Sequence, residues 1–146
     1  MSDGKGLETR LKKLFTAEQE RNSRFAFERL HDARAARGKF PPQPSDFLIN
    51  TYNCTGRPLC IYLEAKETEN EDKITIDSFS QFPRIYRKIL AGATGLLVVY
   101  HTITKLYRFV PLARFPISTR TFNLLDDKTY KKIDQLLGVI HEYDGC

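Results

Sequence analysis

Two short apolar segments joined by a turn, residues 46–52 and 59–66, constrain the fold of this chain most strongly. Between them, residues 54–58 read CTGRP and include the glycine and proline typical of a turn. Both flanking segments are rich in the aromatic and β-branched residues that strands favour, so the sequence predicts a β-hairpin. A hairpin centred on Thr55 sets Leu48 opposite Tyr62 and Asp46 opposite Glu64.

This register predicts that two carboxylates and a lysine meet at the open end of the hairpin. Opposed side chains have Cβ atoms about 4.5–5.5 Å apart, and Lys66 lies two residues past Glu64 on the same face. Two carboxylates this close repel each other unless a cation lies between them, and their oxygens suit Mg²⁺, with Mn²⁺ as a substitute. We therefore expect Asp46 and Glu64 to bind a metal that activates water, and Lys66 to position the water or stabilise developing negative charge.

The acid-x-Lys pattern alone is not specific. It also occurs at residues 71–73 and 126–128, which lie in polar, turn-like stretches. Only Glu64 and Lys66 end an apolar strand with an acid at the matching position of the preceding strand. The alternative interpretation of that combination is an exposed strand end with an ion pair.

The rest of the chain predicts a single α/β domain over residues 1–146, with a central mixed sheet flanked by helices. Apolar periodicity indicates helices at 6–20, from Asp77 or Ser78 to 91, and at about 128–140. Strands are expected near 25–27, where a helix is an open alternative, and at 96–100 and 105–110. Residues 31–44 lack periodicity and are rich in Arg, Gly and Pro, which predicts a loop.

Charge favours a polyanionic partner. The chain has 23 basic and 18 acidic residues, a net charge of +5, and ten of the basic residues lie in residues 1–40 against six acidic ones. A basic region on a small domain is typical of nucleic-acid binding, although a solvated surface explains charge alone equally well. Arg29 and the loop residues Arg34, Arg37 and Lys39 are the candidate DNA contacts.

Three cysteines, an odd number without zinc-site spacing, lead us to expect reduced thiols and a cytoplasmic protein. The polar N-terminus does not resemble a signal peptide. No segment approaches the roughly 20 apolar residues of a membrane span, so no membrane partner is expected.

The residues around the hairpin resemble a known family. Pro44-Ser45-Asp46 followed by Glu64-Ala65-Lys66 is similar to the PD-(D/E)XK nuclease signature, with Ser45 where the signature has proline. The longer string from Glu64 to Asn70 resembles bacterial and phage Holliday-junction resolvases of the RecU type. The resemblance implies a PD-(D/E)XK nuclease-like fold, an Mg²⁺-dependent endodeoxyribonuclease, branched four-way DNA as substrate, and a bacterial or phage-infected cell as the setting.

The same resemblance implies two further site residues. Gly6-Leu7-Glu8 matches a family glutamate on the first helix, which makes Glu8 a metal or water ligand; Phe79-Ser80-Gln81-Phe82 matches a glutamine at a helix start, which makes Gln81 a positioning residue. Glu8 could instead simply favour its helix N-terminus through the macrodipole, and Gln81 could be an ordinary polar first-turn residue. Glu28 is the rival for the third carboxylate.

A four-way junction has approximate two-fold symmetry and requires two cuts, so a homodimer with two sites is expected. The apolar faces of the first helix and of residues 128–140 are the candidate interfaces. Three alternative functions remain: another nuclease of the superfamily, of the restriction or nicking type; a DNA-binding protein without catalysis; and a small subunit of a recombination complex that binds protein partners, whose mark would be an exposed apolar patch. Asp46, Glu64 and Lys66 argue against the second, because a dead site has no physical reason to keep opposed acids.

Overall fold

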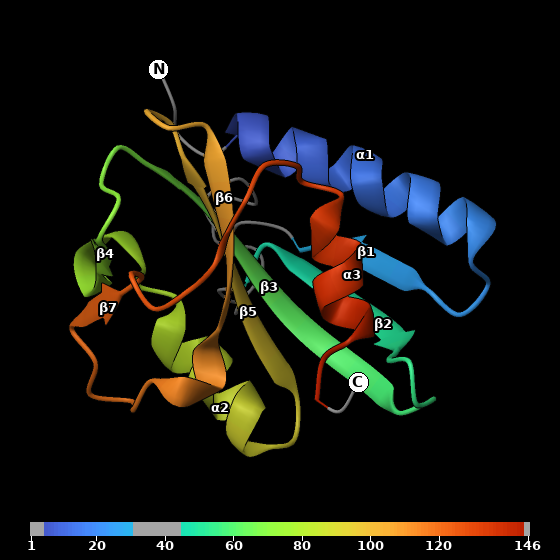
Figure 1. Cartoon of the computed structure of the whole chain (residues 1–146). Coiled ribbons are helices and arrows are strands. Elements are labelled where there is room, and N and C mark those ends of the chain that lie inside the picture. The colour runs from blue at the N-terminus through green and yellow to red at the C-terminus, as the bar shows by residue number, and fades with distance from the viewer. Residues whose placement is uncertain (1–4, 31–44, 145–146) are drawn as a thin grey trace, which may run out of the picture.

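A computed structural model describes residues 5–30 and 45–144, and in this part of the chain a six-stranded mixed sheet is flanked by three helices (Figure 1). The helices are α1 (Lys5–Arg21), α2 (Phe82–Leu90) and α3 (Gln135–His141). In spatial order the strands are β1 (Ala26–Arg29), β2 (Phe47–Tyr52), β3 (Pro58–Thr68), β5 (Thr94–His101), β6 (Leu106–Pro111) and β8 (Thr129–Tyr130). Strands β4 (Lys73–Thr75) and β7 (Thr121–Asn123) form a separate small sheet. The predicted α/β class is confirmed.

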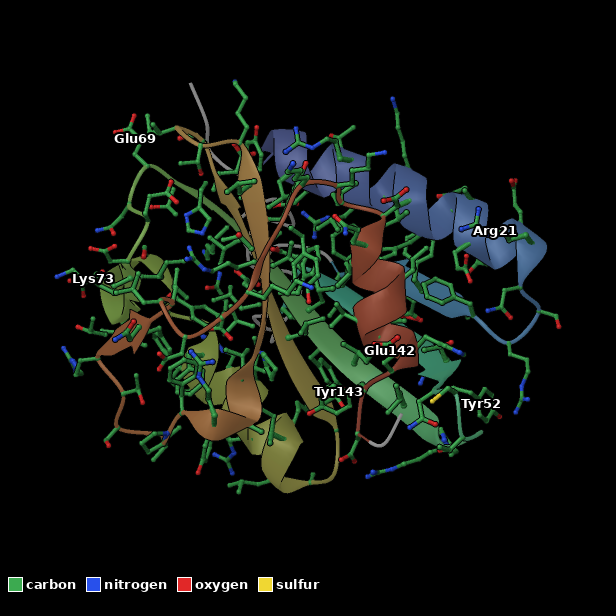
Figure 2. The ribbon with its side chains drawn as sticks, in the orientation of Figure 1. Arg21, Tyr52, Glu69, Lys73, Glu142 and Tyr143 are labelled. Carbon is green, nitrogen blue, oxygen red and sulfur yellow. The ribbon has the colours of Figure 1, made fainter. Side chains whose placement is uncertain are left out.

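The central hairpin has the predicted register. Strands β2 and β3 are antiparallel, with Leu48 opposite Tyr62. In Figure 2, Tyr52 lies at the turn end of this hairpin and Glu69 lies just past the end of β3. On its other side β3 pairs with β5 in parallel, and β5 pairs with β6 in the expected antiparallel manner. The parallel pair requires a crossover between β3 and β5, and α2 lies in that connection.

The two faces of the sheet have separate cores. On one face, α1 and α3 bury apolar side chains against β2, β3, β5 and β6, including Leu7, Leu11, Phe47 and Leu136. On the other face, α2 and the residues around β4 and β7 pack on β5 and β6. The approach of α2 requires a glycine, because a Cβ atom at Gly95 would lie 2.6 Å from Ile89 and 2.9 Å from Ile85.

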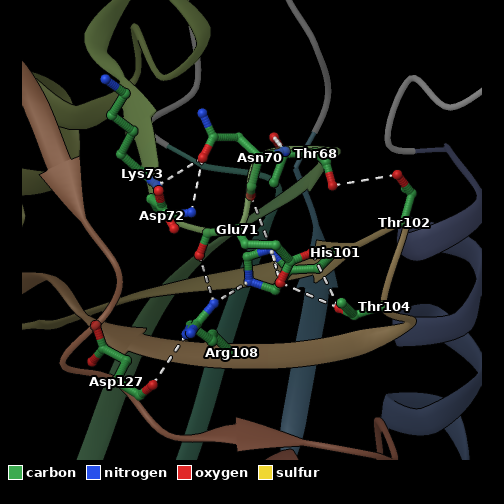
Figure 3. A network of polar contacts seen from close by, with 10 residues as sticks. All are labelled: Thr68, Asn70, Glu71, Asp72, Lys73, His101, Thr102, Thr104, Arg108 and Asp127. Carbon is green, nitrogen blue, oxygen red and sulfur yellow. Dashed lines mark hydrogen bonds and ion pairs between the residues drawn. The ribbon is translucent and has the colours of Figure 1, made fainter.

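A buried polar network fixes the segment that follows β3 (Figure 3). Arg108 donates to His101 Nε2 at 2.8 Å, to the Glu71 carbonyl at 2.9 Å and to the Asp127 carbonyl at 3.0 Å. Because Arg108 can only donate, His101 Nε2 accepts and Nδ1 carries the proton, which it shares with the Asn70 carbonyl at 3.1 Å. This His101–Arg108 network thus ties the chain just after β3 to the β5–β6 pair.

Two predicted helices begin later than expected. The chain forms a 3-10 turn at Ile76–Ser78 and α2 starts at Phe82, with Gln81 as N-cap and a proline in the first turn. Residues near 130 pair with β6 as strand β8 instead of continuing a helix from 128, so α3 starts only at Gln135. In both places pairing or burial of a few side chains outweighs local helical periodicity.

The structure also tests three other expectations. Residues 26–29 form a strand, so the helical alternative there is wrong. The apolar faces of α1 and α3 are buried against the sheet and are not the free dimer surfaces that we expected. Cys54 is disulfide-bonded and Cys60 is a free thiol, so the expectation of uniformly reduced cysteines is wrong at Cys54. The predicted loop 31–44 lies outside the described residues.

Among the described residues, no helix combines the length and the apolar character needed to cross a lipid bilayer.

Candidate active site

Asp46 is held immediately before β2 by the end of β3. Its backbone N–H donates to the Leu63 carbonyl at 3.1 Å, and its carboxylate accepts the Ala65 N–H at 2.9 Å. Ser45, which stands where the nuclease signature has proline, is buried and donates its hydroxyl to the Phe47 carbonyl at 2.9 Å. The bond to Ala65 fixes the Asp46 carboxylate between Glu64 and Lys66, as the register predicted.

Glu64 is a buried carboxylate whose two oxygens differ. Its side chain is only 2% exposed. Oε2 accepts the Lys66 ammonium at 3.2 Å, whereas Oε1 is buried and has no hydrogen-bond partner in the described structure. A buried carboxylate oxygen without a partner is costly, so this atom marks a place where a cation or a proton is expected.

The electrostatics of the carboxylates show that they share one site. Burial, the repulsion of Asp46 and that of Glu8 together raise the pKa of Glu64 to about 8, against the opposing effect of Lys66. Burial also raises the pKa of Asp46, although the Ala65 N–H, Arg29 and Lys66 act in the opposite direction. The pKa of Glu8 is raised by burial and by Asp46. At neutral pH, without a counter-cation, Glu64 therefore tends to hold a proton.

Glu8 reaches the same site from α1, and a contact that sequence reasoning missed places it there. The Glu67 carboxylate, one residue past Lys66, accepts the Leu7 N–H at 2.9 Å and so fixes the start of α1 to the end of β3. The adjacent Glu8 carboxylate pairs with Arg29 of β1. Glu28, the rival third carboxylate, lies exposed on β1 opposite Leu48. The only signal for Glu67 in the sequence was its position beside the motif.

Ideal helix and strand geometry place Gln81 at about the level of this cluster. The Lys88 ammonium lies 5.5 Å from the centre of the Tyr62 ring, and the chain leaves α2 to enter β5 beside Ile61, so α2 runs back along β3. The seven residues from Lys88 back to Gln81 rise about 10 Å, or about three residues of strand, which corresponds to the Ala65–Lys66 level of β3. The Gln81 side-chain oxygen is buried without a hydrogen-bond partner in the described structure.

The donor set fits a hard divalent cation in part. Asp46 and Glu64 supply carboxylate oxygens, and the unpartnered Oε1 of Glu64 is the observation that favours a metal there. Among residues 5–30 and 45–144, however, no three His, Cys, Asp or Glu side chains are already grouped to hold a metal ion. Glu8, the third predicted carboxylate, is paired with Arg29.

The predicted DNA contacts divide into two sets. Arg34, Arg37 and Lys39 lie outside the described residues. Arg29 is described, and its guanidinium donates to Glu8 and to the backbone carbonyls of Leu30 and Asp46. In this structure Arg29 is therefore part of the carboxylate cluster, where it organises the backbone around Asp46.

Comparison with known proteins supports the fold. The mixed sheet flanked by helices matches the fold of a solved structure. A solved structure that matches it is Hjc, a Holliday junction resolvase from the archaeal hyperthermophile Archaeoglobus fulgidus: the TM-score is 0.53, the sequence identity is 16%, and the match covers 90% of this chain and 96% of that chain. No protein-family model matches the sequence, and neither does any curated protein. The likeness is therefore one of fold.

Proposed function

We propose that this protein is a structure-selective DNA endonuclease that resolves four-way junctions by metal-dependent phosphodiester hydrolysis. The observation that carries the proposal is the cluster of Asp46, Glu64 and Lys66 at the open end of the hairpin, with one Glu64 oxygen buried and unpartnered. Support comes from the fold, which resembles that of a Holliday junction resolvase. The neighbour is archaeal, and the likeness to RecU-type resolvases and a bacterial or phage origin rest on the sequence motif.

The residues would divide the chemistry as follows. Asp46 and Glu64 would hold Mg²⁺, or Mn²⁺ in its place, and Glu8 would join them when Arg29 releases it. The bound ion supplies Lewis-acid activation and charge neutralisation. Lys66, whose ammonium touches Glu64 at 3.2 Å, orients the attacking water and stabilises the negative charge that develops on the phosphoryl oxygens. Gln81, with a free side-chain oxygen, positions the same water from the end of α2.

The proposal includes two statements about the setting. Two opposed strands of a junction must be cut and each chain offers one such site, so we propose that the enzyme acts as a homodimer. Because the apolar faces of α1 and α3 are buried against the sheet, the proposed interface would use other surfaces of the chain. Its substrate, cellular DNA, places the activity inside the cell.

The test is cleavage of a synthetic four-way junction, compared with a linear duplex of the same sequence, with Mg²⁺ and with a chelator. The proposal expects the junction to be cut much faster, and only with metal. Equal rates on both substrates would instead favour a restriction or nicking enzyme of the same superfamily. Binding without any cleavage would favour the non-catalytic DNA-binding protein.

A further inference from the structure

Helix α2 carries cations that have no acidic partner. Its nine residues include Arg84, Arg87 and Lys88, and no Asp or Glu. In the described part of the chain no ion pair involves these three residues. Other cations near the same sheet behave differently, because Lys66 and Arg29 pair with Glu64 and Glu8. Lys88 makes a cation–π contact with Tyr62, and no acid among the described residues neutralises its charge or those of Arg84 and Arg87, so the three charges are available for an anionic ligand.

The cations of α2 point in two directions. Phe82 and Ile85 are buried against the sheet, and Ile89 lies partly buried beside them. Lys88 lies on the flank of the helix that faces β3, because its ammonium is over the ring of Tyr62. Arg84 is one turn earlier and, at about 100° per residue, lies about 40° further round towards solvent. Arg87 lies on the side of the helix away from the sheet.

The flank of α2 borders an open part of the sheet. On the face that α2 covers over β5, the side chains of β1 and β2 remain accessible: Ala26, Glu28 and Asn50 are exposed, and Leu48 is half-buried. Asp46 and Glu64 lie at one end of this open face, because they continue the Leu48–Tyr62 row. Glu28 lies on β1 at the far edge of this face, where Arg24 also stacks on the ring of Tyr52, whereas Arg84 and Lys88 lie on its α2 side.

We propose that Arg84 and Lys88 bind the phosphodiester backbone of a duplex DNA arm that lies on the open face of β1–β3. Cationic side chains bind phosphate without regard to sequence and fix the register of the duplex. The two contacts are one helical turn apart along α2, which runs beside β3 from Tyr62 towards Glu64 and Lys66. They therefore guide the DNA backbone towards the carboxylates. This inference rests on the proposed nuclease function and adds the surface that holds its substrate.

The experiment compares two double variants with the wild type. Arg84→Gln with Lys88→Gln removes the proposed contacts, and Lys131→Gln with Lys132→Gln removes the same charge from exposed residues beside β8. Binding to a four-way junction and to a linear duplex is measured by fluorescence anisotropy with a chelator, at several KCl concentrations. Thermal melting confirms that each variant is folded, as expected for substitutions at exposed positions.

For the α2 variant we expect the dissociation constant to rise about 10- to 100-fold, and the slope of log K against log salt to fall by about two, near 0.9 for each lost phosphate contact. The control should change affinity by less than about threefold and keep the slope. Lys88→Arg alone should bind like the wild type, because it keeps the charge.

Equal losses in the two double variants, or wild-type binding by the α2 variant, would overturn the inference. Other outcomes of the experiment test the proposed nuclease function separately from this DNA-binding surface. A wild type that binds DNA through Arg84 and Lys88 but cuts none would remove the nuclease proposal and leave this surface in place. A wild type that binds no DNA would overturn both.

Discussion

The carboxylate cluster and the His101–Arg108 network are both buried polar groups beside β3. They differ in whether their buried polar atoms have hydrogen-bond partners. In the network, Arg108 has three acceptors and each ring nitrogen of His101 has a partner. In the cluster, carboxylates repel one another and the Glu64 Oε1 atom has no partner. Burial of polar groups is inexpensive only when they are paired.

The difference separates a cluster that serves the fold from one that we propose serves chemistry. A satisfied network gains nothing from a ligand and holds the backbone in place. An unsatisfied cluster is relieved by a cation, so its cost to folding becomes affinity for a metal. The two lie close in the chain, since the network fixes Asn70 and Glu71, only a few residues after Lys66.

The largest effect should come from the carboxylates. Asp46→Asn or Glu64→Gln should lower junction cleavage about 10³-fold, near 4 kcal/mol of activation free energy, while junction binding stays within a few-fold. Single-turnover cleavage with Mg²⁺ and anisotropy measure the two quantities. Full cleavage in either variant would remove these residues from the site.

Substitutions in the His101–Arg108 network should lower the stability of the fold. Arg108→Ala leaves the buried His101 ring and two partly buried carbonyls without donors, so the free energy of unfolding should fall by about 3 kcal/mol. Arg120→Ala, at an exposed position, should change it by less than about 0.5 kcal/mol. Urea unfolding gives both values. Similar results for the two variants would show that the network contributes little.

The two clusters should have opposite pH dependences. The raised pKa of Glu64, about 8 against its ordinary value of 4.5, means that the folded state keeps a proton that the unfolded chain releases, so stability falls as pH rises between these values without metal. Burial lowers the pKa of His101 below 6.5, so its contribution is complete above pH 6.5 and is lost as pH falls. Glu64→Gln should therefore stabilise the protein at pH 8 more than at pH 5 in urea unfolding, and a constant difference would contradict this.

The smallest effect tests the link between α1 and β3. Glu67→Ala removes the acceptor of the Leu7 N–H and should lower cleavage about 10-fold and stability by about 1 kcal/mol, because Glu8 loses its fixed position. Glu69→Ala, two residues away and exposed, is the matched control and should behave like the wild type. Equal activity in the two variants would mean that Glu8 does not depend on this bond.

The hairpin and the positions of its carboxylates could be predicted from the sequence because its two strands are close together in the chain. The turn at 54–58 and the alternation of apolar residues fix the register of β2 against β3, and the register alone sets Asp46 beside Glu64. The predicted first residues of α2 and α3 were wrong because they depend on contacts with residues far away in the sequence. Tyr130 joins β6 beside Tyr107, and the residues before Phe82 enter the core of the second face, although their local pattern is helical.

The sequence by itself determined the α/β class, the hairpin and the acid–acid–lysine cluster, since period-two patterns and turn chemistry act over a few residues. Only the tertiary structure decided that Glu67 fixes α1 to β3, that Arg29 engages Glu8, and that Arg84 and Lys88 border an open sheet face. These contacts join residues far apart in the chain. Their partners are set by how helices and strands pack, which local periodicity does not encode.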